Sequence, residues 1–106
     1  MLYDPRWEQR TVTTPCKSWR AVLIEAVATI EQRGLHKGDL LGCDGSVCIM
    51  GAIIERTPLD ACAGRRAERK LARFLKVRSI PVWNDDRHRT EYEVTAALRA
   101  CAVSAV

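Results

Sequence analysis

The sequence predicts a mainly α-helical α+β fold, namely a compact bundle of three longer helices and one short helix with a small β-hairpin insert. Apolar residues recur at helical spacing in three separate segments. An Asp-Gly pair between short apolar runs is typical of a tight hairpin turn. At 106 residues the chain is long enough for one core. We expect an N-terminal arm over residues 1–13 and a single domain over residues 14–106, with the hairpin near residues 39–49.

The first helix is predicted to begin at Thr14-Pro15, because threonine can cap the free N–H groups of a first turn and proline suits the first helical position. Gly34 is placed to end this helix in the left-handed conformation. Between these points the apolar residues follow a helical period and define one inner face. They are Trp19, Val22, Leu23, Ala26, Val27 and Ile30.

The hairpin is predicted at Asp44-Gly45, since a two-residue type I′ turn requires positive φ at both central positions. A lone hairpin is only marginally stable, so this one must pack on helices. Residues 49–55 are expected to form the short buried helix. Gly51 in that helix allows the close approach of another backbone.

Two longer helices are predicted in the second half of the chain. Asp60 is expected to cap a helix that ends near Lys76, with apolar residues on its inner face and basic residues on its outer face. The last helix begins at the capping box Thr90-x-x-Glu93, in which each side chain bonds the backbone N–H of the other residue.

A proline-set loop, residues 80–86, is expected between these two helices. We predict that Trp83 fills the core while Asn84 or Asp85 bonds backbone groups in an Asx-type turn that orients the last helix. The alternative is a small recognition patch made by the same groups. The structural interpretation is preferred for a set of motif residues, namely Cys48, Gly51, Trp83, Asn84, Asp85 and Thr90.

Two segments of the chain carry a resemblance to a known family. They are Asp44-Gly45-Ser46-Val47-Cys48 with Gly51-Ala52, and Pro81-Val82-Trp83-Asn84-Asp85. Over residues 19–102 the chain resembles a family of small proteins from actinobacteria and their phages, a domain of unknown function of the DUF6197 type. The resemblance implies a mainly helical fold and a phage origin, and it implies no activity. Leu35 departs from the family pattern, which tends to have an aromatic residue after the glycine that ends the first helix.

The net charge of +4 is concentrated in one segment. Residues 65–78 contain seven basic residues and one acidic residue, a net +6, so the rest of the chain carries −2. Because cations neutralise phosphates, nucleic-acid binding is the alternative function. Its candidate residues are Arg65, Arg66, Arg69, Lys70, Arg73 and Lys76. Against it, a basic outer face is typical of a solvated helix, and no aromatic residues that could stack on bases are interleaved with the cations.

The five cysteines form no pattern typical of a disulfide framework or a metal site. Neither histidine has a cysteine at zinc-finger spacing, so no metal or other cofactor is expected. A thiol-dependent enzyme is the third hypothesis, with Cys48 as nucleophile, His88 as base and Asp85 or Asp86 orienting it. The apolar neighbours of Cys48 favour a buried, unreactive thiol instead.

We therefore expect a small, non-enzymatic, phage-encoded module that binds a protein partner and modulates a host or phage protein. The first residues show no signal-peptide pattern, which favours the cytoplasm. No apolar run approaches the about 20 residues that span a membrane, so no membrane partner is expected. The sequence favours no particular oligomeric state.

Overall fold

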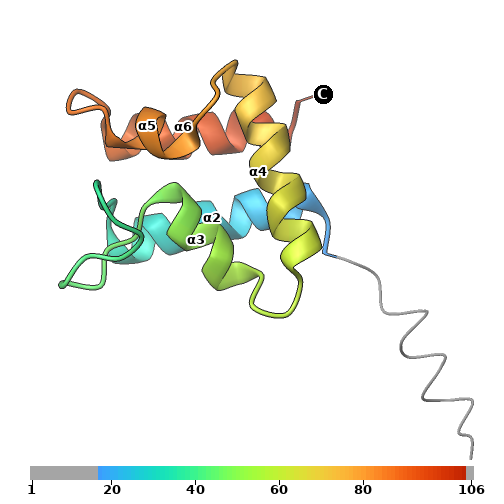
Figure 1. Ribbon diagram of the computed structural model, residues 1–106, viewed down its shortest axis with the longest axis horizontal. Coiled ribbons are helices and arrows are strands. Elements are labelled where there is room, and N and C mark those ends of the chain that lie inside the picture. The colour runs from blue at the N-terminus through green and yellow to red at the C-terminus, as the bar shows by residue number, and fades with distance from the viewer. Residues whose placement is uncertain (1–16, 105–106) are drawn as a thin grey trace, which may run out of the picture.

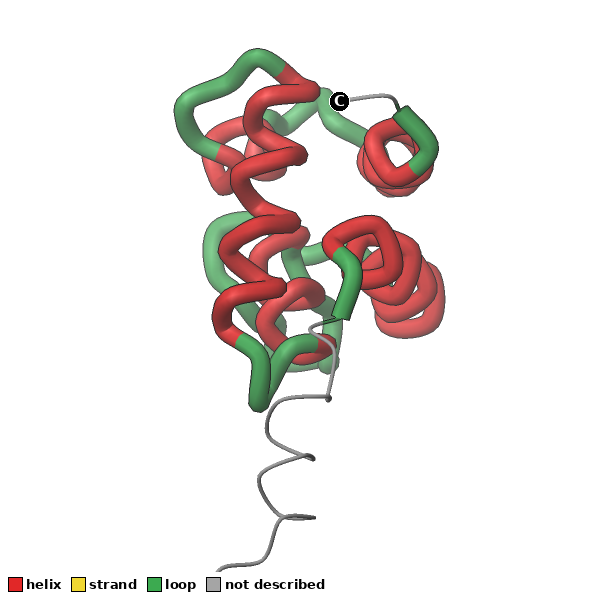
Figure 2. The backbone as a smooth tube through the Cα atoms, turned by 90° about the vertical axis from the view of Figure 1, so that its right-hand side faces the viewer, coloured by secondary structure: helices red, strands yellow, loops and turns green. Residues whose placement is uncertain are grey.

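The computed structural model describes residues 17–104, so the predicted arm lies outside the described residues. The predicted helix start at Thr14-Pro15 is wrong, because the helix begins at Trp19 and is capped by the Ser18 hydroxyl, which accepts from the Arg20 N–H at 3.2 Å. In Figure 1, α5 and α6 lie above α2 and α3, and α4 crosses beside both pairs. Figure 2 shows α2 and α6 nearly end-on, with α4 standing upright beside them. The helices of this part of the chain are α2 (Trp19–Arg33), α3 (Ile49–Arg56), α4 (Ala61–Leu75), α5 (Ile80–Asp85) and α6 (Glu91–Ala102).

The core is organised around α2, which packs against α3, α4 and α6. All six apolar residues predicted for the inner face of α2 are buried. Thr29 on the same helix is also buried, and its hydroxyl donates to the Glu25 carbonyl at 3.0 Å and accepts from Nε of Arg56 at 2.6 Å. The bond between Arg56 and Thr29 ties the end of α3 to the side of α2. The buried Thr29 hydroxyl therefore has a hydrogen-bond partner both as donor and as acceptor.

The helix ends use the capping residues that the sequence indicates. The Asp60 carboxylate accepts from the N–H three residues on at 3.0 Å, and the Thr90 hydroxyl does the same at 3.1 Å. Gly34 ends α2 with φ +91, which is positive as expected, but its ψ of 153 is not that of the left-handed helix. Lys76 ends α4 in the left-handed conformation with φ 58.

The predicted β-hairpin is wrong, because residues 17–104 contain no strand and no sheet. Val47 makes only two isolated bridges, one parallel to Leu35 and one antiparallel to Leu41. Since α3 begins at Ile49, two residues after Val47, the chain turns into a helix before either bridge can extend into a ladder.

The turn between these bridges also differs from the prediction. Gly45 takes positive φ (+89), but Asp44 does not, so the turn is not type I′. The Gly45 N–H donates to the Gly42 carbonyl at 3.0 Å, and the Gly42 N–H donates to the Ser46 carbonyl at 2.8 Å. The Asp44 carboxylate accepts from the Ser46 hydroxyl at 2.6 Å and from the Ser46 N–H at 3.0 Å. These two bonds hold the pKa of Asp44 below its usual value, and the bond from the Ser46 hydroxyl has the larger effect.

The predicted proline-set loop is also wrong, since this segment is the helix α5. The Ser79 hydroxyl caps it by accepting from the Val82 N–H at 3.3 Å. Pro81 is its second residue, where a missing N–H removes no intrahelical bond. Six residues give too short an apolar period to distinguish a helix from a loop. The described chain therefore has five helices and an irregular loop, instead of four helices and a hairpin.

Gly51 lies where α3 meets the backbone of the preceding loop. A Cβ added at this position would lie 2.3 Å from the Leu40 carbonyl oxygen, a separation that real Cβ atoms essentially never show. The Leu40 carbonyl is held in place because it accepts from the Cys48 N–H at 3.2 Å. Any larger residue at position 51 must therefore push α3 away from the loop.

We expect Gly51→Ala to lower the free energy of unfolding by about 2 kcal/mol, because overpacking against fixed backbone exceeds the helix-propensity gain of about 1 kcal/mol. Gly64→Ala is the matched control in α4, since its Cβ would meet the Thr57 hydroxyl, a side-chain atom, at 2.7 Å. Gly64→Ala should lower the free energy of unfolding by less than Gly51→Ala does. Urea unfolding of both variants measures the difference, and a Gly51→Ala protein as stable as the parent would contradict the close approach.

Candidate functional site

Asn84 is the polar centre of the motif region, and its side chain is buried, with 1% of the residue exposed. Its Oδ1 accepts from the Ile49 N–H at 3.0 Å. Its Nδ2 donates to the His36 carbonyl at 3.0 Å and to Oδ1 of Asp85 at 3.0 Å. The carboxamide thus joins α5 to the first residue of α3 and to the loop after α2, whereas the predicted Asx turn would have oriented the last helix.

Three further motif residues take part in the same junction. Oδ1 of Asp85 accepts from the Gly38 N–H at 2.9 Å, which brings the loop against the end of α5. The Cys48 sulfur caps α3 by accepting from the Gly51 N–H at 3.3 Å. We call Cys48, Gly51, Asn84 and Asp85 the α3–α5 latch.

Trp83 lies beside the latch, partly buried against the core. The Arg89 guanidinium covers its ring at 3.9 Å from the centroid, and Nε of Arg89 donates to the Trp83 carbonyl at 3.1 Å. A cation stacked on the ring stabilises this arrangement and occupies one face of the aromatic. That face is therefore closed to a ligand. Thr90 caps the start of α6 and takes no part in this stacking.

The residues of the thiol-enzyme hypothesis lie in different environments. Cys48 is buried, whereas His88 is exposed in the turn after α5. The His88 N–H donates to Oδ1 of Asp86 at 2.9 Å, and this bond lowers the pKa of Asp86. In the described part of the chain no hydrogen bond joins the Cys48 thiol to His88, and no three His, Cys, Asp or Glu side chains lie close enough to hold a metal ion.

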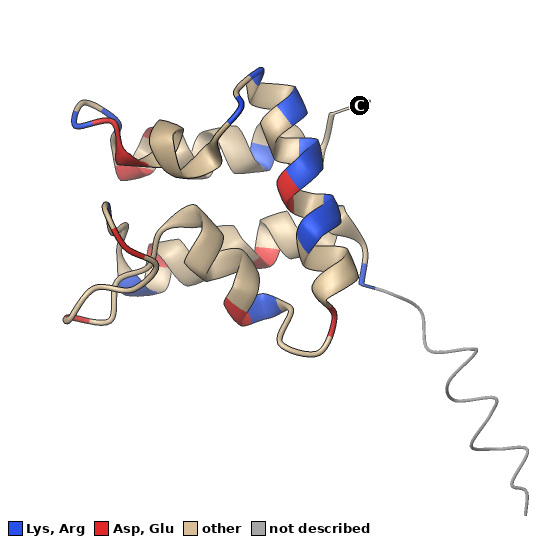
Figure 3. Cartoon of the chain, in the orientation of Figure 1, with Lys and Arg blue, Asp and Glu red and all other residues tan. Residues whose placement is uncertain are grey.

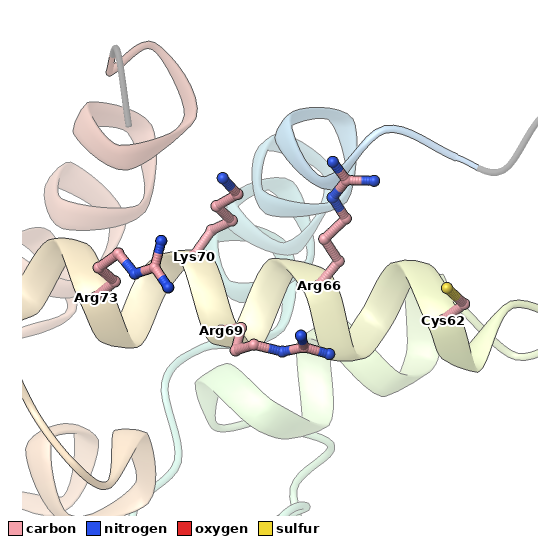
Figure 4. Close-up of a pocket in the computed structure, with 5 residues that line it drawn as sticks. All are labelled: Cys62, Arg66, Arg69, Lys70 and Arg73. Carbon is pink, nitrogen blue, oxygen red and sulfur yellow. The ribbon is translucent and has the colours of Figure 1, made fainter.

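Basic residues are spread along α4, with one acidic residue among them (Figure 3). Four of them line a groove of about 420 Å³. Figure 4 shows Arg66, Lys70 and Arg73 extending from α4 on the side of α2 and α6. Their spacing of three or four residues places them in neighbouring turns. We call the lining residues the α4 basic groove, and they are Cys62, Arg66, Arg69, Lys70 and Arg73.

The groove contains four of the six cations predicted for nucleic-acid binding. Arg65 instead lines an apolar hollow next to α3, and Lys76 ends the helix. Nζ of Lys70 lies 5.4 Å from the ring centroid of Trp19, and the guanidinium of Arg20 lies 4.3 Å from it. Because Trp19 is 8% exposed and already bears two cations, it offers no face for stacking on a base.

A second surface, which the sequence analysis missed, lies on the outer side of α3. Leu40, Leu41 and Ile54 are 50%, 56% and 52% exposed. Two neighbouring isoleucines on one helix are a signal that could have revealed it, since residues 53 and 54 point about 100° apart and cannot both enter one core. We call the apolar residues of this region the α3 apolar surface, and they are Leu40, Leu41, Met50, Ile54 and Pro58.

Two hollows shape the α3 apolar surface. One, of about 370 Å³, is lined by both leucines and Ile54, with Gly51 among its lining residues. The ion pair between Arg33 and Glu55 lies at this hollow. The other hollow, of about 360 Å³, shares Ile54 and extends between α3 and α4. Ile54 is therefore the common wall of both.

No helix within residues 17–104 is long and apolar enough to cross a membrane. A family model described as a family of unknown function, DUF6197, matches residues 15–104. The chain belongs to DUF6197. The match includes the latch, the groove and the apolar surface of this DUF6197 protein, and it confirms the family resemblance. Neither the curated proteins nor the solved structures include one that matches the chain.

Replacing Asn84 with alanine should lower the free energy of unfolding of this DUF6197 protein by about 3 kcal/mol, because the Ile49 N–H and the His36 carbonyl lose their partner. Val82→Ala in the same helix is the control, since Val82 is 72% exposed and its truncation should cost about 0.5 kcal/mol or less. Urea unfolding compares the two. Equal stability of the two variants would show that the carboxamide does not hold α5 to α3.

Iodoacetamide should modify Cys43 and Cys62 in the folded protein and should spare Cys48 and Cys101 until denaturant is added. The first two thiols are exposed and the last two are buried, and burial also raises the pKa of the Cys101 thiol. Mass spectrometry of the peptides gives each rate. Reaction of Cys48 as fast as that of Cys43 would contradict its burial and would favour the thiol-enzyme hypothesis.

Proposed function

We propose that the chain is a non-enzymatic binding module that docks on a protein partner through the α3 apolar surface. The observation that carries this proposal is the grouping of Leu40, Leu41 and Ile54, each about half exposed, around one hollow. Single exposed apolar side chains are normal on soluble proteins, but apolar side chains that gather around a concave site are typical of interaction surfaces.

The chemistry of this surface favours an apolar helix of the partner as the occupant. The charges of Arg33 and Glu55 at the hollow satisfy each other, so they leave no net charge to select a charged ligand. Two hollows that share Ile54 provide two places for apolar anchors. Helices that bind in grooves present such anchors along one face.

The cellular setting is part of the same proposal. The DUF6197 resemblance implies a phage gene in an actinobacterial host, and we propose that the module acts in the host cytoplasm. Its partner would be a host or phage protein whose activity it modulates. The family membership supports this setting only because the resemblance to that family implies it.

Ile54→Asp should remove the capture of such a partner from a nuclease-treated actinobacterial lysate, because a carboxylate would be buried at the centre of the interface. Val82→Asp is the matched control, since it adds the same charge at an exposed apolar position of α5. Quantitative mass spectrometry should show one protein enriched about tenfold by the parent and by Val82→Asp relative to Ile54→Asp. The purified protein should repeat this difference in a direct binding measurement.

Two outcomes would contradict the proposal. The first is capture that does not distinguish Ile54→Asp from Val82→Asp. The second is a parent protein that sediments as a dimer while Ile54→Asp sediments as a monomer, because the apolar surface would then bind a second copy of the chain. Circular dichroism of both variants controls for the loss of α3.

A further inference from the structure

We propose that the α4 basic groove binds the phosphate backbone of nucleic acid. This site is separate from the α3 apolar surface, and it does not depend on the protein partner proposed for that surface. Arg66, Arg69, Lys70 and Arg73 line a groove of about 420 Å³ on α4. In Figure 4, Arg69 lies along the lower edge of the helix while the other three extend toward α2 and α6.

The arrangement of charges within α4 is the first argument. The one acidic residue of the helix, Glu68, lines the apolar hollow between α3 and α4 and does not line the groove. The groove cations are therefore each other's neighbours at three or four residues, for example Arg66 with Lys70 and Arg69 with Arg73. Such like-charge pairs destabilise a helix by about 0.2–0.5 kcal/mol each, so a purely structural helix would not favour them. A polyanion bound in the groove would attract these cations and offset their mutual repulsion.

The second argument is that no carboxylate of the described residues forms an ion pair with a groove cation. None of the four groove cations lies within 4.0 Å of a carboxylate among residues 17–104. Four cations elsewhere in this part of the chain form ion pairs, whereas others, for example Lys37, Arg78 and Arg87, have no ion-pair partner among these residues. The ion pairs are Lys17–Glu25, Arg33–Glu55, Arg89–Glu93 and Arg99–Glu31. What distinguishes the groove is that four cations without a carboxylate partner in this part of the chain line one site, where an anionic ligand can contact several of them.

The length of the groove suits successive phosphates. Arg66 and Arg73 are seven residues apart, which corresponds to about 10 Å along the helix. Successive phosphates of one DNA strand rise about 3.4 Å along the duplex axis and lie farther apart in space, so the cations can reach more than one of them. Arginine adds a planar fork of donors that matches phosphate oxygens.

The surroundings of the groove favour nucleic acid over a membrane surface. A helix that lies on a membrane inserts an apolar face beside its cations. In α4, Ala67 and Leu71 are instead buried in the core, and Phe74 and Leu75 are partly buried against it. Because Trp19 is covered and buried, the groove contacts the backbone and not the bases. Binding should therefore depend strongly on salt and little on sequence.

The test measures the affinity of the full chain for a fluorescein-labelled 20-base-pair DNA duplex by anisotropy in 50 mM salt. Arg69→Gln with Lys70→Gln should weaken binding about tenfold and should reduce the slope of log affinity against log salt by about 2. Arg65→Gln with Lys76→Gln is the matched control, because it removes the same charge from the same segment outside the groove. Its affinity should change less than about threefold.

A footprint locates the bound duplex independently of these variants. Cys62 lines the groove and Cys43 lies in the loop before α3, and both thiols are exposed. Saturating DNA should slow maleimide modification of Cys62 at least about fivefold and leave the rate of Cys43 unchanged, since a bound strand blocks access only to the groove. Peptide mass spectrometry measures both rates in one sample.

Three results would overturn the inference. They are no DNA binding by the parent protein, an equal loss of affinity in the two double variants, and equal protection of Cys62 and Cys43. A groove-dependent affinity for polyglutamate that matches or exceeds the affinity for DNA would overturn the nucleic-acid assignment and would indicate an acidic protein segment instead.

Discussion

The buried carboxamide of Asn84 is the contact on which the arrangement of α3, α5 and the intervening loop depends. The first N–H groups of any helix lack partners within the helix, and in α3 the Ile49 N–H finds its partner in Asn84. This bond seats the start of α3, where Gly51 meets the Leu40 carbonyl. The same placement leaves Ile54 on the outer side of the helix. The latch therefore holds the fold and also presents the α3 apolar surface.

The sequence predicted those elements whose causes are local. The inner face of α2 follows a long apolar period, and Asp60 and Thr90 cap their helices by short-range bonds. The hairpin failed because an Asp-Gly pair also suits other turns, and here only Gly45 takes positive φ. The latch bond between Asn84 and Ile49 joins residues 35 apart in the chain, and no local pattern records such a contact.

The two proposed binding surfaces differ in how far the sequence revealed them. The cations of α4 were visible in the sequence, but which of them line the groove and which, like Arg65, line the neighbouring hollow depends on the helix and its neighbours. Ile54 was assigned to a buried helix and is instead half exposed. The groove and the apolar surface lie on different helices, so one can be altered while the other is kept.

Hydrogen exchange of the Ile49 N–H, followed by NMR, tests the latch most directly. The Met50 N–H is the internal reference, because the described residues provide no acceptor for it. If Asn84 holds the start of α3, the Ile49 N–H should exchange about a hundredfold more slowly than the Met50 N–H, since it opens only when α5 separates from α3. Equal exchange rates of these two amides would contradict the latch.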